Sequence, residues 1–325
     1  MHIPGKGASP RGEPRRTGII AAVISVQNVS KTFGRFGRRT RALDGVSLQV
    51  TRGETLGLIG PNGAGKTTLL SCLLGFLRPD SGSLSVDGLP VDDLRVRART
   101  GYMPERLGFD ADLSGARFLA QHWRLAGGDP ARTEAAIADA AERVGLERPA
   151  LARRLKTYSR GMLQRIGVAQ ATLRDPELLF LDEPASGADP LGVAIIRDRI
   201  LDAKRRGATV VLNSHQLPEV ERVCDRVVFI DHGHLTREET LTGEAASRRR
   251  AVIRVPAERA QAALEALAAA GCAAEPGDGG ALRLAAADEA AVSAAVKALA
   301  LADIAVLEVR SSAELEELFR PGSAT

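Results

Sequence analysis

Aromatic residues are scarce in this sequence. They make up 3% of its 325 residues, as eight Phe, two Tyr and one Trp. Proteins that bind single-stranded nucleic acid stack bases on aromatic side chains, so this scarcity argues against that class. Neither sign of charge dominates the sequence. It has 44 Lys and Arg residues and 40 Asp and Glu residues, which gives a net charge of +4. A charge this small and diffuse gives no indication of a nucleic-acid partner.

Cysteines and long apolar runs are few as well. Cys72, Cys224 and Cys272 are far apart and lack the spacing of a zinc site, so we interpret them as reduced, mostly buried thiols. No apolar run reaches the ~18–20 residues that a membrane-spanning helix needs, and GIIAAVIS at 18–25 is too short. The remaining composition, 44% hydrophobic and 26% charged, is typical of a soluble globular protein.

The order of apolar segments predicts two folded units of unequal size. Residues 1–21 have no periodicity and predict a disordered basic tail. Over 22–245, apolar strands alternate with helical stretches, which favours an α/β domain with a mainly parallel sheet and an antiparallel β subdomain. Within it, the strand-free stretch at about 107–157 predicts a helical subdomain. The Ala-rich residues 246–325 predict a small accessory α+β domain.

Short apolar segments mark the expected strands. In the large domain these are VISVQNV, VSLQV, ETLGLIG, LLFLD, TVVLNS and VVFID. In the accessory domain they are AVIRV, GALRL and IAVLEV, with helices expected at 257–270 and 288–300 in a βαββ-like order. SAELEELF at 312–319 predicts a final amphipathic helix.

The strongest motif is GPNGAGKTT at 60–68, here called the phosphate loop. It matches G-x-x-x-x-G-K-[ST] between a predicted strand and a helical run. Its glycines let the backbone approach phosphates at a helix N-terminus, which attracts anions. Lys66 can reach the β- and γ-phosphates, and the Thr67 hydroxyl can bind Mg²⁺. The predicted nucleotide-binding residues of this loop are Asn62, Gly63, Ala64, Gly65, Lys66, Thr67 and Thr68.

Two further strand ends carry groups for acid–base chemistry. In LLFLDEP at 178–184, Asp182 emerges at the carboxyl end of a buried strand, where open α/β sheets bind ligands. We expect Asp182 to hold Mg²⁺ through water and Glu183 to polarise the attacking water as a general base. His215 follows the strand TVVLNS and would contact the γ-phosphate from the same edge.

These motifs, with TYSRGMLQR at 157–165 between them, resemble the ATP-binding subunits of ABC transporters over about residues 22–240. YSRGM at 158–162 stands where the family has its signature segment, usually LSGGQ. SGADP at 186–190 is similar to the family's D-loop, with Asp189 at its acidic position. GYMPE stands where the Q-loop is expected.

The resemblance also assigns roles to single residues. It implies that His215 is the switch histidine and that Phe33 stacks on adenine, with an ordinary core phenylalanine as the alternative. Glu105 replaces the usual Gln of the Q-loop, and its carboxylate can still bind Mg²⁺ or water. In the signature segment Arg160 replaces a Gly, as in the exporter branch of the family. Tyr158 and Met162 also depart from the usual pattern, and Ser159 and Gly161 match it.

In this family two ATPase domains pair head to tail, so each nucleotide lies between one phosphate loop and the partner's signature segment. The resemblance therefore implies that Ser159, Arg160 and Gly161 serve a nucleotide held by a second subunit, most simply an identical chain. It also implies ATP and Mg²⁺ as cofactors and a separately encoded membrane permease, contacted by residues 107–157 and linked to the nucleotide by Glu105. No nucleic-acid partner is expected. The chain would be peripheral on the cytoplasmic face of the membrane and would drive export.

Two other functions stay open at this point. One is a soluble ABC-type ATPase acting in translation or DNA repair. Translation factors of this kind carry two such domains, and repair ATPases separate their motifs with coiled coils or zinc modules, which this sequence lacks. The other is a small-molecule kinase, which would leave the signature segment without a role. The transported substance would bind in the membrane subunit, so its identity is not encoded in this chain.

Overall fold

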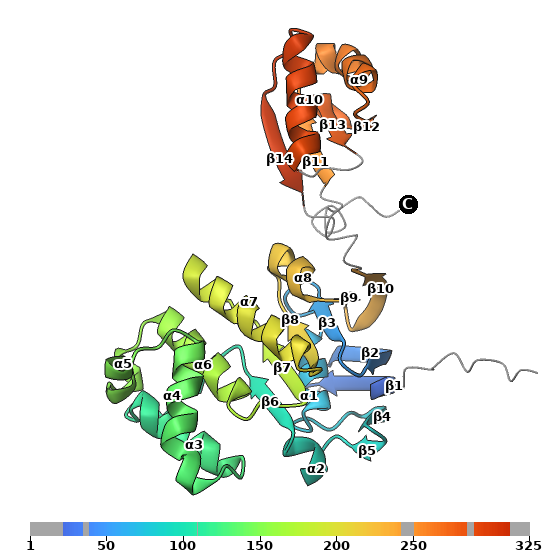
Figure 1. Ribbon diagram of the computed structural model, residues 1–325. Helices are drawn as coiled ribbons and strands as arrows, with labels where there is room; N and C mark the ends of the chain where they lie inside the picture. The colour runs from blue at the N-terminus through green and yellow to red at the C-terminus, as the bar shows by residue number, and fades with distance from the viewer. Residues whose placement is uncertain (1–21, 35–38, 109, 242–249, 285–288, 313–325) are drawn as a thin grey trace, which may run out of the picture.

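The computed structural model describes residues 22–34, 39–108, 110–241, 250–284 and 289–312, in three sheets with associated helices (Figure 1). The predicted tail 1–21 and all but the first residue of the predicted helix at 312–319 lie outside the described residues. No helix among the described residues has both the length and the apolar character needed to cross a bilayer.

The central sheet has six strands in the order β10-β9-β3-β8-β7-β6. Its strands are β3 (Thr55–Ile59), β6 (Thr100–Met103), β7 (Leu178–Asp182), β8 (Thr209–Asn213), β9 (Arg226–Asp231) and β10 (His234–Thr240). All neighbours pair in parallel except β9 and β10, which form an antiparallel hairpin at one edge. The predicted mainly parallel sheet is confirmed.

A second, antiparallel sheet has the strand order β2-β1-β4-β5. Its strands are β1 (Ala22–Phe33), β2 (Thr40–Thr51), β4 (Ser81–Val86) and β5 (Leu89–Pro90). It packs with α1 (Lys66–Leu73) on one face of the central sheet, where they share one hydrophobic core. Longer helices cover the other face with a second core.

Alternating side chains explain why the central strands are apolar throughout. Along β7, Leu178 and Phe180 belong to the core shared with the antiparallel sheet, whereas Leu179 and Leu181 belong to the core shared with the helices. A strand covered on both faces has no polar side, so its sequence reads as a continuous apolar run. Asp182 ends that run at the carboxyl edge of the sheet.

The stretch between β6 and β7 is helical, as predicted. Its elements are α3 (Gly115–Leu125), η1 (Pro130–Arg132), α4 (Thr133–Arg143), α5 (Arg148–Ala152), η2 (Leu155–Thr157) and α6 (Arg160–Thr172). The Asp129 side chain caps η1, and Gly145, with φ 64°, follows the end of α4. The remaining helices of this part are α2 (Leu94–Arg97), α7 (Pro190–Arg205) and α8 (Leu217–Val223).

The third sheet belongs to the C-terminal part and has its own hydrophobic core, formed only by residues between 251 and 306. Its elements are β11 (Arg250–Arg254), η3 (Ala257–Arg259), α9 (Ala260–Ala269), β12 (Ala274–Pro276), η4 (Asp278–Gly280), β13 (Ala281–Leu284), α10 (Glu289–Leu301) and β14 (Glu308–Ser312). The strand order β12-β13-β11-β14 with all-antiparallel pairing is that of a split βαβ fold.

Two details of this part differ from the sequence predictions. We expected a βαββ-like order, but the observed order is βαββαβ. The sequence prediction missed the short strand β12, which holds Pro276 and lies at the sheet edge. The strand predicted over 304–309 begins only at Glu308. Ile304 precedes the strand and is buried in the core of this part. An apolar residue at this position therefore reflects core packing and does not indicate a strand.

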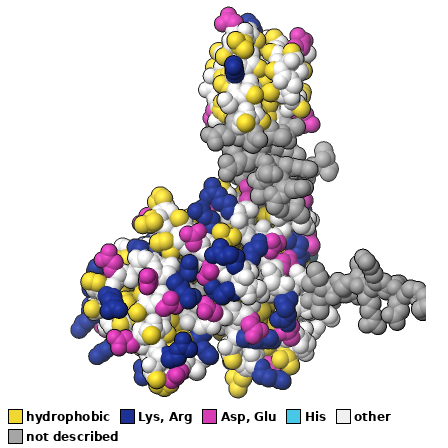
Figure 2. Space-filling model, in the orientation of Figure 1, with side chains coloured by type: hydrophobic (Ala, Val, Ile, Leu, Met, Phe, Trp, Pro, Cys, Tyr) yellow, Lys and Arg dark blue, Asp and Glu magenta, His cyan; other side chains and the backbone are white. Residues whose placement is uncertain are grey.

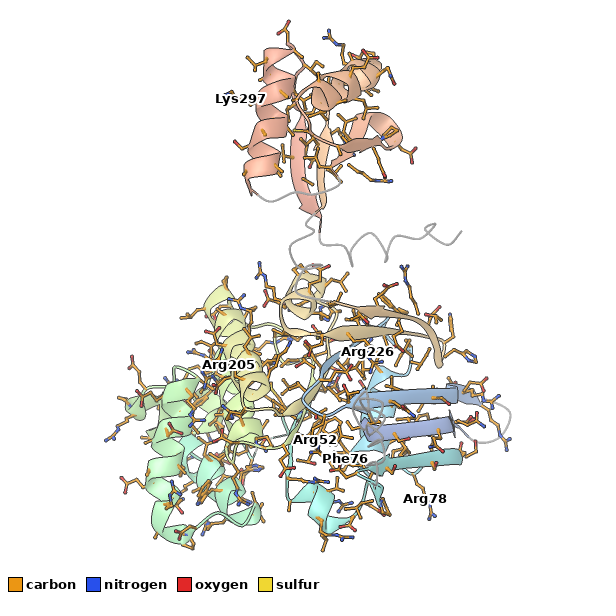
Figure 3. All side chains as sticks on the ribbon, turned by 45° about the vertical axis from the view of Figure 1, so that its right-hand side comes forward. Arg52, Phe76, Arg78, Arg205, Arg226 and Lys297 are labelled. Carbon is orange, nitrogen blue, oxygen red and sulfur yellow. The ribbon has the colours of Figure 1, made fainter. Side chains whose placement is uncertain are left out.

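An ion pair ties the antiparallel sheet to the central sheet. Arg226 on β9 donates to the Glu54 carboxylate at 2.6 Å and to the Gln49 carbonyl of β2 at 2.6 Å. The Thr51 hydroxyl and N–H also donate to Glu54, both at 2.7 Å. Figure 3 labels Arg226 where β9 and β10 meet the strands β1 and β2. Burial raises the pKa of Glu54, but the bonds from Arg226 and Thr51 outweigh it and hold the pKa below its usual value.

We expect Glu54→Gln to lower the free energy of unfolding at pH 7 by about 2 kcal/mol, because it removes the buried partner of Arg226 and leaves only the exposed Glu238 paired with it. A lowered folded-state pKa stabilises the fold above the ordinary value of 4.5, and this contribution disappears as pH falls through the folded-state pKa. Urea unfolding should therefore show a difference between variant and parent that shrinks below pH 4.5.

The control is Glu177→Gln, which breaks the pair with Arg99 on the surface, where Glu177 is 59% exposed. It should change stability by at most about 1 kcal/mol. Equal losses for the two variants would contradict a specific role for the Glu54–Arg226 pair.

Candidate nucleotide site

The phosphate loop is held in a conformation that only small residues allow. Gly65 precedes α1 with φ 111°, and a Cβ there would lie 2.3 Å from the Ala42 carbonyl oxygen. A Cβ on Gly60 would lie 2.0 Å from the Ile230 carbonyl oxygen. Lys66 is 6% exposed, and its Nζ donates to the carbonyls of Gly60 at 2.7 Å and Pro61 at 3.0 Å. The lysine therefore closes the loop on itself at the start of the helix.

A cavity of about 670 Å³ opens over this loop. It lies at the carboxyl ends of the central strands, the edge at which open α/β sheets bind ligands. Its lining residues are Gly60, Pro61, Asn62, Gly63, Gly65, Lys66, Thr67, Thr68, Glu105, Glu183, Ser186, Asn213 and His215. The structure thus brings together residues from four segments that are far apart in the sequence.

Asp182 lies beneath this cavity and is only 1% exposed. Its carboxylate accepts hydrogen bonds from the Asn213 amide and the Thr67 hydroxyl. Burial is the main cause that raises the pKa of Asp182, and the charge of Glu105 adds to it, whereas the Asn213 bond opposes it. The Asp182 carboxylate is therefore held in place by the two groups that donate to it.

Sequence reasoning missed Asn213. It pairs in register with Asp182 on the neighbouring strand and is 2% exposed, and its Oδ1 is buried without a hydrogen-bond partner among the described residues. An amide at the end of the apolar run TVVLN, two residues before His215, was the signal that could have identified it.

Glu183 and His215 face each other at the mouth of the cavity. The Glu183 Oε2 and His215 Nδ1 atoms are 2.7 Å apart. The Glu183 side chain is 11% exposed and that of His215 is 61% exposed, so the pair joins the buried site to its open side. Glu183 has φ 50°, unusual for a residue with a side chain, and its N–H donates to the Asn213 carbonyl at 2.8 Å.

The charges around Lys66 show what the cavity can accept. Burial lowers the pKa of Lys66, and the charges of Glu183, Asp182 and Glu105 oppose that shift. One cation among several carboxylates leaves the site short of positive charge for a triphosphate. A divalent cation would make up the difference.

The residues present fit Mg²⁺. Thr67, Asp182 and Glu105 supply hydroxyl and carboxylate oxygens, which are the ligands Mg²⁺ prefers. No cluster of three or more His, Cys, Asp or Glu side chains able to hold a metal occurs in the part of the chain that the structure describes. Mg²⁺ uses few protein ligands and takes the rest from water and phosphate.

The signature segment lies outside this cavity. Ser159 caps α6, and its Oγ accepts from the Met162 N–H at 3.2 Å. Tyr158, which replaces the usual Leu, is 8% exposed and donates its hydroxyl to the Ala150 carbonyl at 2.7 Å. Ser159, Arg160 and Gly161 do not line the cavity.

Besides Asp182, three other predicted residues lie outside the cavity lining. Asp189 caps α7 by accepting from the Gly192 N–H at 2.7 Å. Ala64 is buried under the loop. Phe33, at the end of β1, is 44% exposed, with Lys31 Nζ 6.0 Å from its ring centre. A core role for Phe33 is thereby excluded, and its ring is open to a ligand.

Comparison with known proteins supports the resemblance to ABC transporter ATP-binding subunits. The family model for ABC transporters matches residues 43–186. An uncharacterized ABC transporter ATP-binding protein of Synechocystis is 39% identical over 232 residues, which cover 70% of this chain and 66% of that protein. The chain thus spans just under two thirds of that relative's length. YdbJ of Bacillus subtilis, another uncharacterized ABC transporter ATP-binding protein, is 37% identical, with coverage of 73% and 76%.

Further similarities extend the comparison. The Nod factor export ATP-binding protein I of Paraburkholderia xenovorans is 37% identical, covering 67% of this chain and 70% of that protein. Among solved structures, an ATP-binding subunit of an ABC transporter superposes with a TM-score of 0.61 at 30% identity, covering 67% of this chain and 90% of that one. The relatives' names, the matched family model and the phosphate-loop cavity agree. The chain belongs to the family of ABC transporter ATP-binding proteins.

Proposed function

We propose that this chain hydrolyses ATP as one of two paired subunits and drives a separately encoded membrane permease. The observation that carries the proposal is the cavity itself. It gathers a phosphate loop, a buried aspartate and a glutamate–histidine pair, while the chain's own signature segment lies outside it. Such a cavity can hold a nucleotide on one side and leaves its other side for a second protein surface.

The chemistry of the first side follows from the residues that line it. The N–H groups of the phosphate loop and Lys66 would bind the phosphates. Mg²⁺ held by Thr67, Asp182 and Glu105 would neutralise charge on the β- and γ-phosphates when bound. Glu183 would orient and deprotonate the attacking water, and the hydrogen bond with His215 holds its carboxylate toward the cavity.

The second side would come from another copy of the chain. Ser159, Arg160 and Gly161 stand at the N-terminus of α6, the positive end of a 13-residue helix, and they do not line the chain's own cavity. In a two-fold pair each chain would place this helix end over the partner's nucleotide. ATP would favour the closed pair because its γ-phosphate touches both chains, and hydrolysis removes that contact. Phe33 would stack on the adenine.

The permease would bind at a groove of about 690 Å³ between the part of the chain around α2 and β6 and the helices α3 and α6. Leu94 on α2 and Leu125 on α3 lie in its lining and are 77% and 76% exposed. Exposed leucines at a groove are typical of a surface that another protein covers. Glu105 follows β6, which also contributes to this groove, and would link it to the nucleotide.

Export is the direction we propose, and the relatives support it. One is named for Nod factor export, and a relative from Streptomyces coeruleorubidus, 36% identical, is named for daunorubicin resistance. Neither name concerns translation or DNA repair. Figure 2 shows Lys and Arg interspersed with Asp and Glu over the visible face of the large unit, rather than the continuous basic surface of a nucleic-acid protein.

We also propose the domain division predicted from the sequence, with an ATP-binding domain at 22–245 and an accessory domain at 246–325. The separate hydrophobic core of the C-terminal part supports it. As the partner of a membrane permease, the chain would be peripheral on the cytoplasmic face of the membrane.

Replacing the proposed general base tests the catalytic assignment. Glu183→Gln should reduce ATP turnover by at least ~100-fold and leave ATP binding intact, because the amide keeps the shape of the carboxylate but cannot accept the proton. With ATP and Mg²⁺ it should accumulate as a dimer in size-exclusion chromatography with light scattering. Glu177→Gln, on an exposed glutamate, is the matched control. Turnover that stays at the parental rate would refute the assignment.

Charge at the groove tests the permease surface. We expect the double variant Leu94→Glu, Leu125→Glu to lose co-purification with the co-expressed permease and to bind ATP as the parent does, since both side chains are exposed and distant from the phosphate loop. Leu301→Glu, at a leucine of α10 that is 80% exposed, is the control and should keep the permease. Retention of the permease by the groove variant would contradict this assignment.

A further inference from the structure

The two edges of the C-terminal sheet differ in length and composition. One edge is β12, which has three residues and ends in Pro276. A proline cannot donate a backbone hydrogen bond, and short strands or prolines are common means of protecting a sheet edge from pairing. The other edge is β14, which has five residues and no proline. Of these two edges, β14 therefore offers the backbone to which another strand can add.

Apolar side chains lie exposed beside β14. In the part of the chain that the structure describes, β14 pairs with β11 alone, and Figure 1 shows it at the outer edge of the sheet next to α10. Val309 lies opposite Ile253 of β11, and so on the face that packs against α9 and α10, yet it is 43% exposed. Leu307, just before β14, is 62% exposed, and Leu301, the last residue of α10, is 80% exposed. Exposed apolar residues that gather at one edge are typical of a surface that another protein covers.

Two residues of opposite charge flank Val309 in the sequence of β14. Glu308 lies opposite Arg254 of β11, and Arg310 lies opposite Val252. Because successive residues of a strand alternate between the two faces, Glu308 and Arg310 share the face that Val309 does not occupy. An acidic and a basic residue placed symmetrically about an apolar one make the strand complementary to its own reversed copy.

The register of such a pair follows from these charges. Two identical antiparallel strands are related by a two-fold axis, so one residue lies opposite its own copy. If that residue is Val309, Glu308 of each copy lies opposite Arg310 of the other. A pair centred on Glu308 or on Arg310 would place like charges directly opposite each other, which destabilises a strand pair. The sequence of β14 therefore favours the register centred on Val309.

We propose that two copies of this chain bind each other through β14, which joins their four-stranded C-terminal sheets into one continuous sheet. Leu307 and Val309 of both copies would then be covered at the junction. The residues that follow, SAELEELF at 312–319, predict a helix, which cannot extend a sheet edge, so they are not the occupant. The contact needs no nucleotide and is therefore additional to the ATP-dependent pairing of the proposed function. One pair of strands buries little area, so this contact is weak and reversible.

Reversal of charge in the full-length, nucleotide-free protein tests the register. Sedimentation equilibrium of the parent should show concentration-dependent dimers. Arg310→Glu and Glu308→Arg should each raise the dissociation constant at least ~tenfold, because both symmetric charge pairs become repulsive. An equimolar mixture of the two variants should bind as the parent does, since every pair between them again joins opposite charges. A monomeric parent, or a mixture that does not associate, would overturn the proposal.

The matched control is Glu265→Arg, at an exposed glutamate of α9. This helix packs against β12 and β13, away from β14, so the reversal should leave the dissociation constant unchanged. An equal loss of dimers in this control would show that overall charge, and not the β14 register, decides association.

A cysteine cross-link tests the same register without reversing a charge. In a Cys272→Ser background, Val309→Cys should form a disulfide between two nucleotide-free copies, seen on a non-reducing gel. Residues directly opposite in an antiparallel pair have Cα atoms about 4.5–5.5 Å apart, within the reach of a disulfide. Cys72 and Cys224 are buried and should not react. Glu275→Cys, on β12 at the other edge, is the control and should not cross-link.

Failure of Val309→Cys to cross-link, or equal cross-linking by Glu275→Cys, would refute pairing through β14. These measurements are made without nucleotide, so they decide the β14 contact even if no form of the protein hydrolyses ATP. That second result would count against the proposed function alone.

Discussion

The buried ammonium of Lys66 is the interaction on which the site depends. It is bonded to two carbonyls of its own loop and surrounded by the charges of Glu183, Asp182 and Glu105. Those carboxylates lie at or just after the ends of other strands, and the Lys66 charge offsets part of the repulsion among them, together with the bonds that Asn213 and Thr67 donate to Asp182. The phosphate loop therefore lies at the centre of the cavity at the carboxyl edge of the central sheet.

A two-sided sheet makes this arrangement possible. Since every central strand is covered on both faces, the only places where its residues can meet a ligand are the strand ends. Asp182 and Asn213 end neighbouring strands in register, and Glu183 and His215 continue from the same strands. The groups to which we assign catalytic roles are consequently placed at the ends of rigid strands, whereas the proposed partner would contact the signature segment at the start of α6.

The ABC transporter family and the α/β fold were both predicted from the sequence, and the comparisons confirm them. These predictions succeeded because the phosphate loop and the strand LLFLD are local patterns whose meaning depends on nearby residues. The roles of single site residues stay proposals. The strand β12 was missed and β14 was placed too early, because short edge strands and buried loop residues such as Ile304 carry no clear alternation.

The sequence by itself determined which chemical groups the chain carries and in what order: phosphate loop, signature segment, aspartate–glutamate pair and histidine. Only the tertiary structure decided which of them share a cavity. It joined Asn213 and Ser186 to the site, left Ser159 outside it, and turned the Arg160 side chain onto its own chain. The reason is physical. Helix and strand patterns depend on neighbours along the chain, but contacts between side chains 26 or 31 residues apart arise only when the sheet and helices have packed.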